Sequence, residues 1–345
     1  MIQNIQNFAV SGYHVWITFV LSAALIVFAA MQLAKWGDVI AARTKLGGMF
    51  VGVLLLAGAT SMPELLTGIN SIFQNQPNIS AGNFLGSSAF NMLILAFMDL
   101  FSQHERVLRT SAFKHALSGG LTVFLTTMVL FFICANPMLE EIHFQIGWVG
   151  IDSLIIIGFY IFSVYLIQKN EADDVSAEMT EEQLAEIPTL KTAILGFIFD
   201  VILLAIASPL MVASSAVISD VTGLGTSFIG SSLVALITSL PELVTSVSAV
   251  KIGAADMGIG NLFGSNMFNM FGLAICDFFY TKGRFINQID KSFIFIGMLG
   301  VMMTAFGLVG NVAKFKRLKV IEVDSLIMII MYLGGMYLLY LQTVG

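Results

Sequence analysis

Charged residues are scarce in this chain. Only 11% of its 345 residues are Asp, Glu, Lys or Arg, against roughly 25% in a soluble globular domain. Hydrophobic residues make up 57% of the chain, and its mean hydropathy is +0.89. This composition excludes an ordinary soluble protein and indicates one that is embedded in a lipid bilayer.

Cysteine and histidine are also rare. Cys134 and Cys276 both fall inside hydrophobic stretches, so we expect neither a disulfide framework nor a thiolate metal site and interpret both as small packing residues. No nucleophile and base can be paired and no cofactor-binding loop is present, so the sequence predicts no enzyme, no resident cofactor and no nucleic-acid partner. The histidines lie near predicted span ends or loops, and we interpret them as structural: His14, His104, His115 and His143.

Hydrophobic windows of suitable length recur along the chain. A helix needs about 20 apolar residues to cross the ~30 Å hydrocarbon core. The first window is too long for a signal peptide and lacks a basic start and a cleavage site, so we expect it to be retained. We therefore predict an all-α polytopic membrane protein with ten transmembrane helices. Its windows are residues 15–34, 47–73, 80–100, 112–133, 148–168, 192–213, 226–250, 257–279, 292–311 and 321–341.

The basic residues predict the orientation of the chain. The loops that follow the odd-numbered windows hold all of the 16 Lys and Arg residues except three, which are Lys282, Arg284 and Lys291. Basic loops remain preferentially in the cytoplasm. We therefore expect the odd-numbered loops to be cytoplasmic and both termini to lie outside a plasma or inner membrane.

Two segments of the chain repeat each other at an offset of 178 residues. ATSMPELLTG is matched by ITSLPELVTS, and GNFLGSSAFNM by GNLFGSNMFNM, within the regions 47–101 and 225–279. Each copy sets one glutamate inside an apolar run, Glu64 in the first and Glu242 in the second. A carboxylate at membrane depth costs about 2.5 to 3.5 kcal/mol. A glutamate carried at two equivalent positions therefore predicts a symmetric ion site.

Matching positions of the two copies are separated by five windows. Because five is odd, the copies must cross the membrane in opposite senses, which makes an inverted-topology repeat. Such repeats are typical of secondary transporters that bind their substrate near the bilayer midplane. We predict two five-helix halves, 1–168 and 192–345. They are joined by the acidic segment 169–191, which we interpret as a solvated cytoplasmic linker.

The repeated motifs offer oxygen ligands. Pro63 and Pro241 remove a backbone donor, so we expect each helix to kink or unwind at the Thr-Ser pair before it. Two carboxylates balance one Ca2+, a hard cation that prefers oxygen. The motifs lack His and Cys, which counts against zinc, copper and iron. The predicted pocket consists of Thr60, Ser61, Glu64, Ser87, Asn91, Thr238, Ser239, Glu242, Ser265 and Asn269.

The two motifs resemble the alpha repeats of the sodium/calcium exchanger family, within the cation/calcium antiporter superfamily, and its prokaryotic members in particular. The T-S-x-P-E and G-S-x-x-x-N segments, the ten windows and the central hydrophilic segment carry the resemblance over nearly the whole chain. It implies that the second, third, seventh and eighth spans form an ion-binding core and that the first and sixth slide against it. It also implies that the motif Glu, Thr, Ser and Asn residues bind the ions.

The chain departs from the commoner family pattern at three positions. Ala59 and Ile237 stand where relatives commonly have Gly, and Asn269 stands where many have Asp. The predicted pocket therefore carries two carboxylates rather than three. At an effective dielectric near 20, a unit charge about 4 Å from an ion is worth roughly 4 kcal/mol before desolvation is subtracted, which is enough to change ion occupancy.

Together these observations predict a secondary active antiporter that exports Ca2+ by alternating access, with Na+ favoured as the coupling ion. Export against a gradient of about ten-thousand-fold and 100 mV needs about 10 kcal/mol, whereas one monovalent ion entering down a tenfold gradient and 100 mV supplies roughly 3.7 kcal/mol. About three monovalent ions per Ca2+ are then needed. The alternatives are a Ca2+/H+ exchanger and, less favoured, a cation channel or a membrane-embedded sensor.

Overall fold

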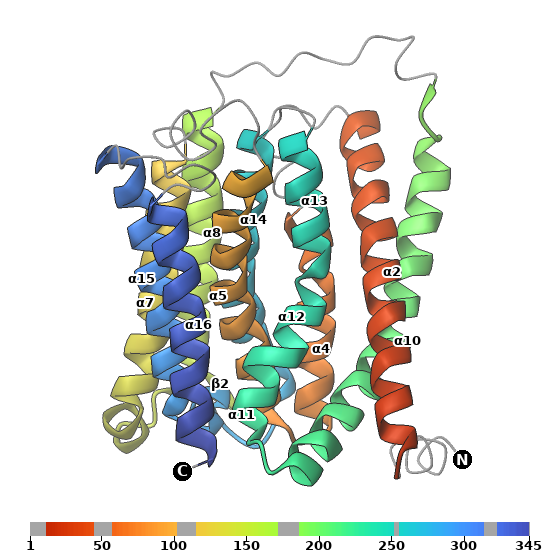
Figure 1. Ribbon diagram of the computed structural model, residues 1–345. Coiled ribbons are helices and arrows are strands. Elements are labelled where there is room, and N and C mark those ends of the chain that lie inside the picture. The colour runs from red at the N-terminus through yellow and green to blue at the C-terminus, as the bar shows by residue number, and fades with distance from the viewer. Residues whose placement is uncertain are drawn as a thin grey trace.

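The computed structural model describes residues 12–44, 57–101, 115–171, 186–251, 255–313 and 323–344. This part of the chain is almost entirely helical (Figure 1), with one short antiparallel hairpin of β1 (Gln145–Ile146) and β2 (Val149–Gly150). The helices are α2 (His14–Thr44), α4 (Met62–Phe73), α5 (Pro77–Phe101), α7 (Ala116–Glu141), α8 (Ile151–Glu171), α10 (Leu190–Thr222), α11 (Thr226–Ile229), the π-helical turn η1 (Gly230–Val234), α12 (Ala235–Thr238), α13 (Leu240–Lys251), α14 (Ala255–Phe279), the 3-10 turn η2 (Phe285–Gln288), α15 (Ser292–Ala313) and α16 (Val323–Val344).

Eight of the described helices are long and apolar enough to cross a membrane. A ninth crossing is formed if the bent pair Thr226–Thr238 and Leu240–Lys251 is one span. These nine correspond to nine of the predicted windows. Of the remaining window, 47–73, residues 47–56 lie outside the described part of the chain, and residues 57–60 and α4 are helical. The prediction of a polytopic helical membrane protein is confirmed at this level.

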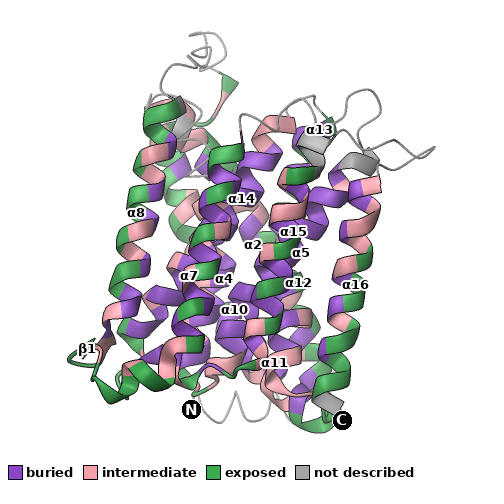
Figure 2. Cartoon of the chain, turned by 90° about the vertical axis from the view of Figure 1, so that its left-hand side faces the viewer, coloured by how far each residue is buried: buried purple, intermediate pink, exposed green. Residues whose placement is uncertain are grey.

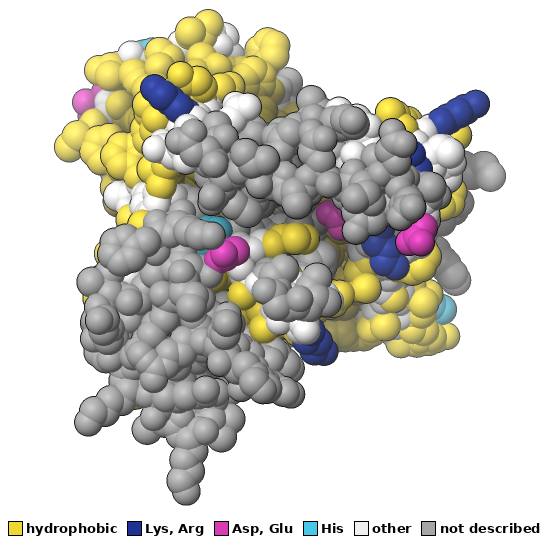
Figure 3. Space-filling view, turned by 90° about the horizontal axis from the view of Figure 1, so that it is seen from above, with side chains coloured by type: hydrophobic (Ala, Val, Ile, Leu, Met, Phe, Trp, Pro, Cys, Tyr) yellow, Lys and Arg dark blue, Asp and Glu magenta, His cyan; other side chains and the backbone are white. Residues whose placement is uncertain are grey.

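The outer surface of the helices suits contact with lipid. Large apolar side chains such as Leu21 of α2, Phe131 of α7 and Leu333 of α16 are more than half exposed. Exposed residues line the outward faces of the helices and buried ones line the inward faces (Figure 2). Seen from above, hydrophobic side chains gather at the upper left and at the right of the view, and a few Lys, Arg, Asp and Glu side chains lie at this end (Figure 3).

The longest helices, α2 and α10, lie side by side at one flank of the molecule (Figure 1). They have 31 and 33 residues and bury Ile26 and Leu33 of α2 together with Leu204 of α10 in one apolar cluster. Gly196 of α10 lies against the Trp36 ring, and a Cβ atom there would come within 2.4 Å of an indole carbon. The glycine therefore gives the indole the room to pack between the two helices.

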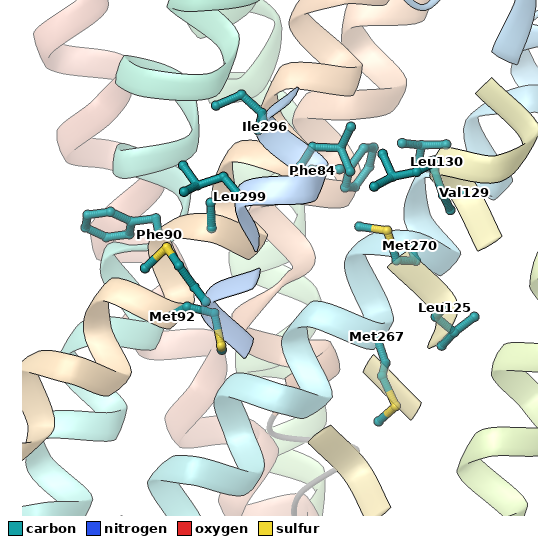
Figure 4. Packing of buried hydrophobic residues seen from close by; sticks show 14 of the residues in the cluster. Phe84, Phe90, Met92, Leu125, Val129, Leu130, Met267, Met270, Ile296 and Leu299 are labelled. Carbon is teal, nitrogen blue, oxygen red and sulfur yellow. The ribbon is translucent and has the colours of Figure 1, made fainter. Parts of the chain in front are cut away.

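A second and larger apolar cluster fills the opposite flank. It includes Phe84 and Met92 of α5, Leu125 of α7, Met270 of α14 and Ile296 of α15, whose side chains are drawn in Figure 4. Between the two flanks lie α4 and the broken helix α11 to α13 (Figure 1). These central helices, with the facing sides of α5 and α14, carry the buried polar residues of the motifs.

A buried charged group joins distant parts of the chain at one end of the bundle. Arg284, only 2% exposed, forms an ion pair with the buried Asp152 of α8. Beside them, the Asp277 carboxylate accepts hydrogen bonds from the Gly150 N–H at 2.6 Å and the Phe285 N–H at 2.5 Å. Arg284, one of the three basic residues that depart from the orientation pattern, therefore has a structural partner.

The two cysteines have different environments. Both are free thiols, and Cys276 is buried beside Ser80, whose hydroxyl lies 3.6 Å from the Cys276 sulfur. The interpretation of Cys134 as a packing residue is wrong, because this side chain is exposed. The hydrophobic stretch around Cys134 predicts a span, and Cys134 lies in α7, but hydropathy does not tell which face of the helix a residue occupies. His104 and residues 172–185 of the predicted acidic linker lie outside the described residues.

Candidate ion-binding site

All ten residues of the predicted pocket are buried, each at most 1% exposed. They come from the helical residues 57–60 and the turn at Ser61, from α4 and α5, and from their counterparts α12, α13 and α14. In Figure 1, α4 occupies the lower half of the molecule and α13 the upper half, with the start of each near mid-height. The carboxylates at the starts of these helices therefore lie far from either end of the bundle.

Each proline-containing helix is broken at the serine of its motif. Ser61 has φ −88° and ψ 6°, Ser239 has φ −90° and ψ 5°, and the second helix bends by 44° at this point. The helices do not unwind, because the Ser61 N–H still donates to the Ala57 carbonyl at 2.9 Å and the Ser239 N–H to the Ala235 carbonyl at 3.1 Å. The prediction of a kink is confirmed in the second motif, and unwinding is absent.

The two motifs exchange hydrogen bonds. Ser61 Oγ donates to Glu242 Oε1 at 2.9 Å, and Ser239 Oγ donates to Glu64 Oε1 at 3.0 Å. Each serine precedes the glutamate of its own motif by three residues but contacts the glutamate of the other motif. This reciprocal arrangement brings both carboxylates into one polar region between the two broken helices.

The serines and threonines of the motifs complete this region. Ser87 Oγ lies 3.4 Å from both Glu64 Oε1 and Thr238 Oγ1, so it contacts both motifs. In the equivalent place, Ser265 Oγ lies 3.4 Å from Thr60 Oγ1. The structure therefore brings the predicted hydroxyl groups of both copies into direct contact.

Two glycines allow α5 to approach the broken helix closely. A Cβ atom at Gly82 would come within 2.8 Å of the Gly230 backbone, and one at Gly86 within 2.5 Å of the Ser231 carbonyl oxygen. Only glycine fits such a backbone approach. The approach positions the neighbouring Ser87 against Thr238 of α12.

Two asparagines that we did not include in the predicted pocket are part of it. Thr238 Oγ1 donates to Asn83 Oδ1 at 2.9 Å, and Thr60 Oγ1 donates to Asn261 Oδ1 at 3.3 Å. Asn83 Nδ2 also donates to the Glu64 carbonyl at 2.8 Å. Both asparagines are buried. The available sequence signal was that they are identical between the two copies.

Asn91 and Asn269 each contact the opposite helix of the α5 and α14 pair. Asn91 Nδ2 donates to Asn266 Oδ1 at 2.9 Å, and Asn269 Nδ2 lies 3.5 Å from Ser88 Oγ. Ser88 and Asn266 occupy equivalent positions in the two copies but differ in residue type. The sequence repeat therefore gave no signal for either of them.

Four buried oxygens of the site have no hydrogen-bond partner within the described residues: Glu64 Oε2, Glu242 Oε2, Asn91 Oδ1 and Asn269 Oδ1. In that same part of the chain, neither glutamate forms an ion pair with a basic side chain, and no group of three or more His, Cys, Asp and Glu residues exists. A buried carboxylate needs a counter-charge or a proton. Free carboxylate and amide oxygens around two such groups suit a hard cation.

Known proteins with similar sequences are membrane proteins and exchangers. The inner membrane protein YrbG of Escherichia coli (strain K12) is 24% identical over 258 residues, which cover 73% of this chain and 75% of that protein. The sodium/calcium exchanger MaX1 of Methanosarcina acetivorans is 26% identical over 286 residues, which cover 74% of this chain and 80% of that protein. The similarity thus extends over most of each protein.

The fold is also shared with a solved structure. The sodium-calcium exchanger NCX_Mj, soaked with 2.5 mM Na+ and 0.1 mM Sr2+, has a TM-score of 0.56 and 22% sequence identity, covering 93% of this chain and 97% of that one. The family model described as sodium/calcium exchanger protein matches residues 14–168 and 192–341, which is most of the chain. The protein is therefore a multi-pass membrane transporter and belongs to the sodium/calcium exchanger family.

Proposed function

We propose that the protein exports Ca2+ in exchange for Na+, with about three Na+ per Ca2+, by alternating access. The reciprocal contacts of Ser61 with Glu242 and of Ser239 with Glu64 support this proposal most strongly. They hold two carboxylates of opposite repeats in one buried region whose four unpartnered oxygens face no basic side chain among the described residues. One Ca2+, or more than one monovalent cation, balances this charge.

The hydrogen bonds suggest how binding and movement are coupled. Each glutamate uses one oxygen to accept a serine hydroxyl and keeps the other unpartnered. A cation bound to the free oxygens of both glutamates links α4 with α13, which occupy opposite halves of the molecule. We propose that the pair α2 and α10 slides against this core, and that the ten predicted pocket residues bind the transported ions in both states.

The coupling ion is tested by transport into proteoliposomes. We expect 45Ca2+ uptake to be driven by an outward Na+ gradient at constant pH, and to be weak when only a pH gradient is imposed. Uptake driven by the pH gradient alone would show a Ca2+/H+ exchanger instead. Uptake that needs neither gradient would show a channel and contradict antiport. Empty liposomes carried through the same gradients serve as the control.

We also propose ten transmembrane helices in two inverted five-helix halves, 1–168 and 192–345, with both termini outside. Cysteine accessibility tests this topology. Asn75, after α4, is equivalent to Gly253, which lies outside the described residues, so the exposed Lys251 at the end of α13 replaces it. In a background without the native cysteines, a membrane-impermeant maleimide added to intact cells should label Asn75→Cys, and Lys251→Cys only after the membrane is opened. Labelling of both without opening would contradict the inversion.

A further inference from the structure

Hydrogen bonds between α5 and α14 determine the orientation of the side-chain amides of two site residues, Asn91 and Asn269. We propose that Ser88 and Asn266 are positioning residues, which orient Asn91 and Asn269 so that both present an oxygen, and not an N–H group, to the transported cation. This inference rests on the proposed cation site. Positions 88 and 266 are equivalent in the two copies, but they hold different residues, so the sequence repeat did not point to them.

The orientation of the Asn91 amide depends on a backbone carbonyl, through Asn266. Asn266 Nδ2 donates to the Ser88 carbonyl at 3.2 Å, and a carbonyl can only accept. The amide of Asn266 is therefore fixed, with its Oδ1 directed at Asn91. Asn91 must meet this oxygen with its own Nδ2, which it does at 2.9 Å. The Oδ1 of Asn91 is then the free end, and it is buried with no partner among the described residues.

The orientation of the Asn269 amide depends on the hydroxyl group of Ser88. The Ser88 hydroxyl donates its one proton to the Phe84 carbonyl at 3.0 Å, so toward any other neighbour it can only accept. Asn269 Nδ2 lies 3.5 Å from this hydroxyl oxygen. The amide of Asn269 therefore also turns its Nδ2 toward α5. Its Oδ1 is the fourth unpartnered oxygen of the site.

Orientation matters because the two ends of an amide have nearly the same size and shape. Packing alone does not distinguish the oxygen from the NH2 group, so only hydrogen bonds determine which end faces the ion. A reversed amide would place two protons with partial positive charge where a cation needs a ligand. A site with only two carboxylates depends more on such neutral oxygens than a site with three.

A double-mutant cycle separates orientation from mere packing. In Asn266→Leu the acceptor for Asn91 is lost, and we expect the Kd for Ca2+, measured by calorimetry on the purified protein, to rise about tenfold. In Asn91→Asp both ends of residue 91 are oxygens, so there is no orientation to fix. In that variant a carboxylate oxygen faces Asn266 Oδ1, and two acceptors repel each other. We therefore expect Asn266→Leu to leave the Kd unchanged or to lower it when it is made in Asn91→Asp. The exposed Asn170→Leu is the control and should leave the Kd unchanged.

The outcomes distinguish this inference from the proposed function. An equal rise of the Kd in both backgrounds would show a structural role for Asn266 and overturn the inference, while Ca2+ binding by the parent protein would leave the proposed function standing. If the parent bound no Ca2+, the proposed function itself would fail. Should Asn266→Leu elute as an aggregate in gel filtration, Asn266→Ala, whose side chain also has no acceptor for Asn91, gives the same cycle.

Discussion

Glu64→Gln and Glu242→Gln are each expected to abolish Ca2+ exchange in reconstituted protein. Each substitution keeps the size of the side chain but removes one of the two charges that balance Ca2+. At an effective dielectric near 20, one unit charge about 4 Å from a monovalent ion is worth roughly 4 kcal/mol before desolvation is subtracted, and more for a divalent ion. Every 1.4 kcal/mol is about tenfold in affinity, so a loss on the order of a thousand-fold is expected.

The structure also predicts that the two variants behave alike. Each glutamate accepts a serine hydroxyl of the other motif with Oε1 and leaves Oε2 unpartnered among the described residues. In either variant the amide nitrogen takes the place of an oxygen in this arrangement. 45Ca2+ flux and gel filtration should show an inactive but folded transporter in both cases. The exposed Glu140→Gln is the matched control, and near-normal flux in either site variant would refute the site assignment.

Asn269→Asp is expected to change the response to the coupling ion while Ca2+ is still recognised. The substitution adds a third carboxylate to the predicted pocket, which should bind a further cation or a proton there. It also places a carboxylate oxygen near Ser88 Oγ, whose proton is donated to the Phe84 carbonyl. We expect the apparent affinity for Na+ to change by about tenfold or more and transport to depend more steeply on pH.

Two titrations of the reconstituted protein measure this effect: Ca2+ flux against Na+ and Ca2+ flux against pH. The parent and the Asn269→Asp variant are compared in each. The exposed Asn170→Asp adds the same charge away from the site and controls for effects of net charge. If the curves of the parent and the Asn269→Asp variant overlay in both titrations, position 269 does not contact a transported ion.

The sequence predicted the central residues of the site because a single charge inside an apolar run is costly. Glu64 and Glu242 were recognisable because this cost is carried at equivalent positions of the two copies, and their neighbours were recognisable by the same repeat. Which serine contacts which glutamate was not predictable, since the exchange of partners between motifs depends on how distant helices pack. Ser88 and Asn266 were missed because they differ between the copies, so symmetry carried no information about them.

The same distinction applies outside the site. The windows located the spans, since apolar length is a local property of the sequence. The windows did not show that Cys134 lies on an exposed face of its helix. They also did not reveal the carboxylate partner of Arg284, which lies 132 residues away in the chain. Tertiary packing determines which buried polar residues pair in this way. The local sequence around each residue therefore does not predict its partner.

The ion pair of Arg284 with Asp152 has a consequence for how the protein is made. A ribosome that adds about 5 to 20 residues per second needs roughly 7 to 26 s to pass from residue 152 to residue 284. During that interval Asp152 is already synthesised while its guanidinium partner does not yet exist. The N-terminal helices therefore cannot complete their packing at this end on their own, and maturation of the transporter must wait for the segment after α14 to leave the ribosome.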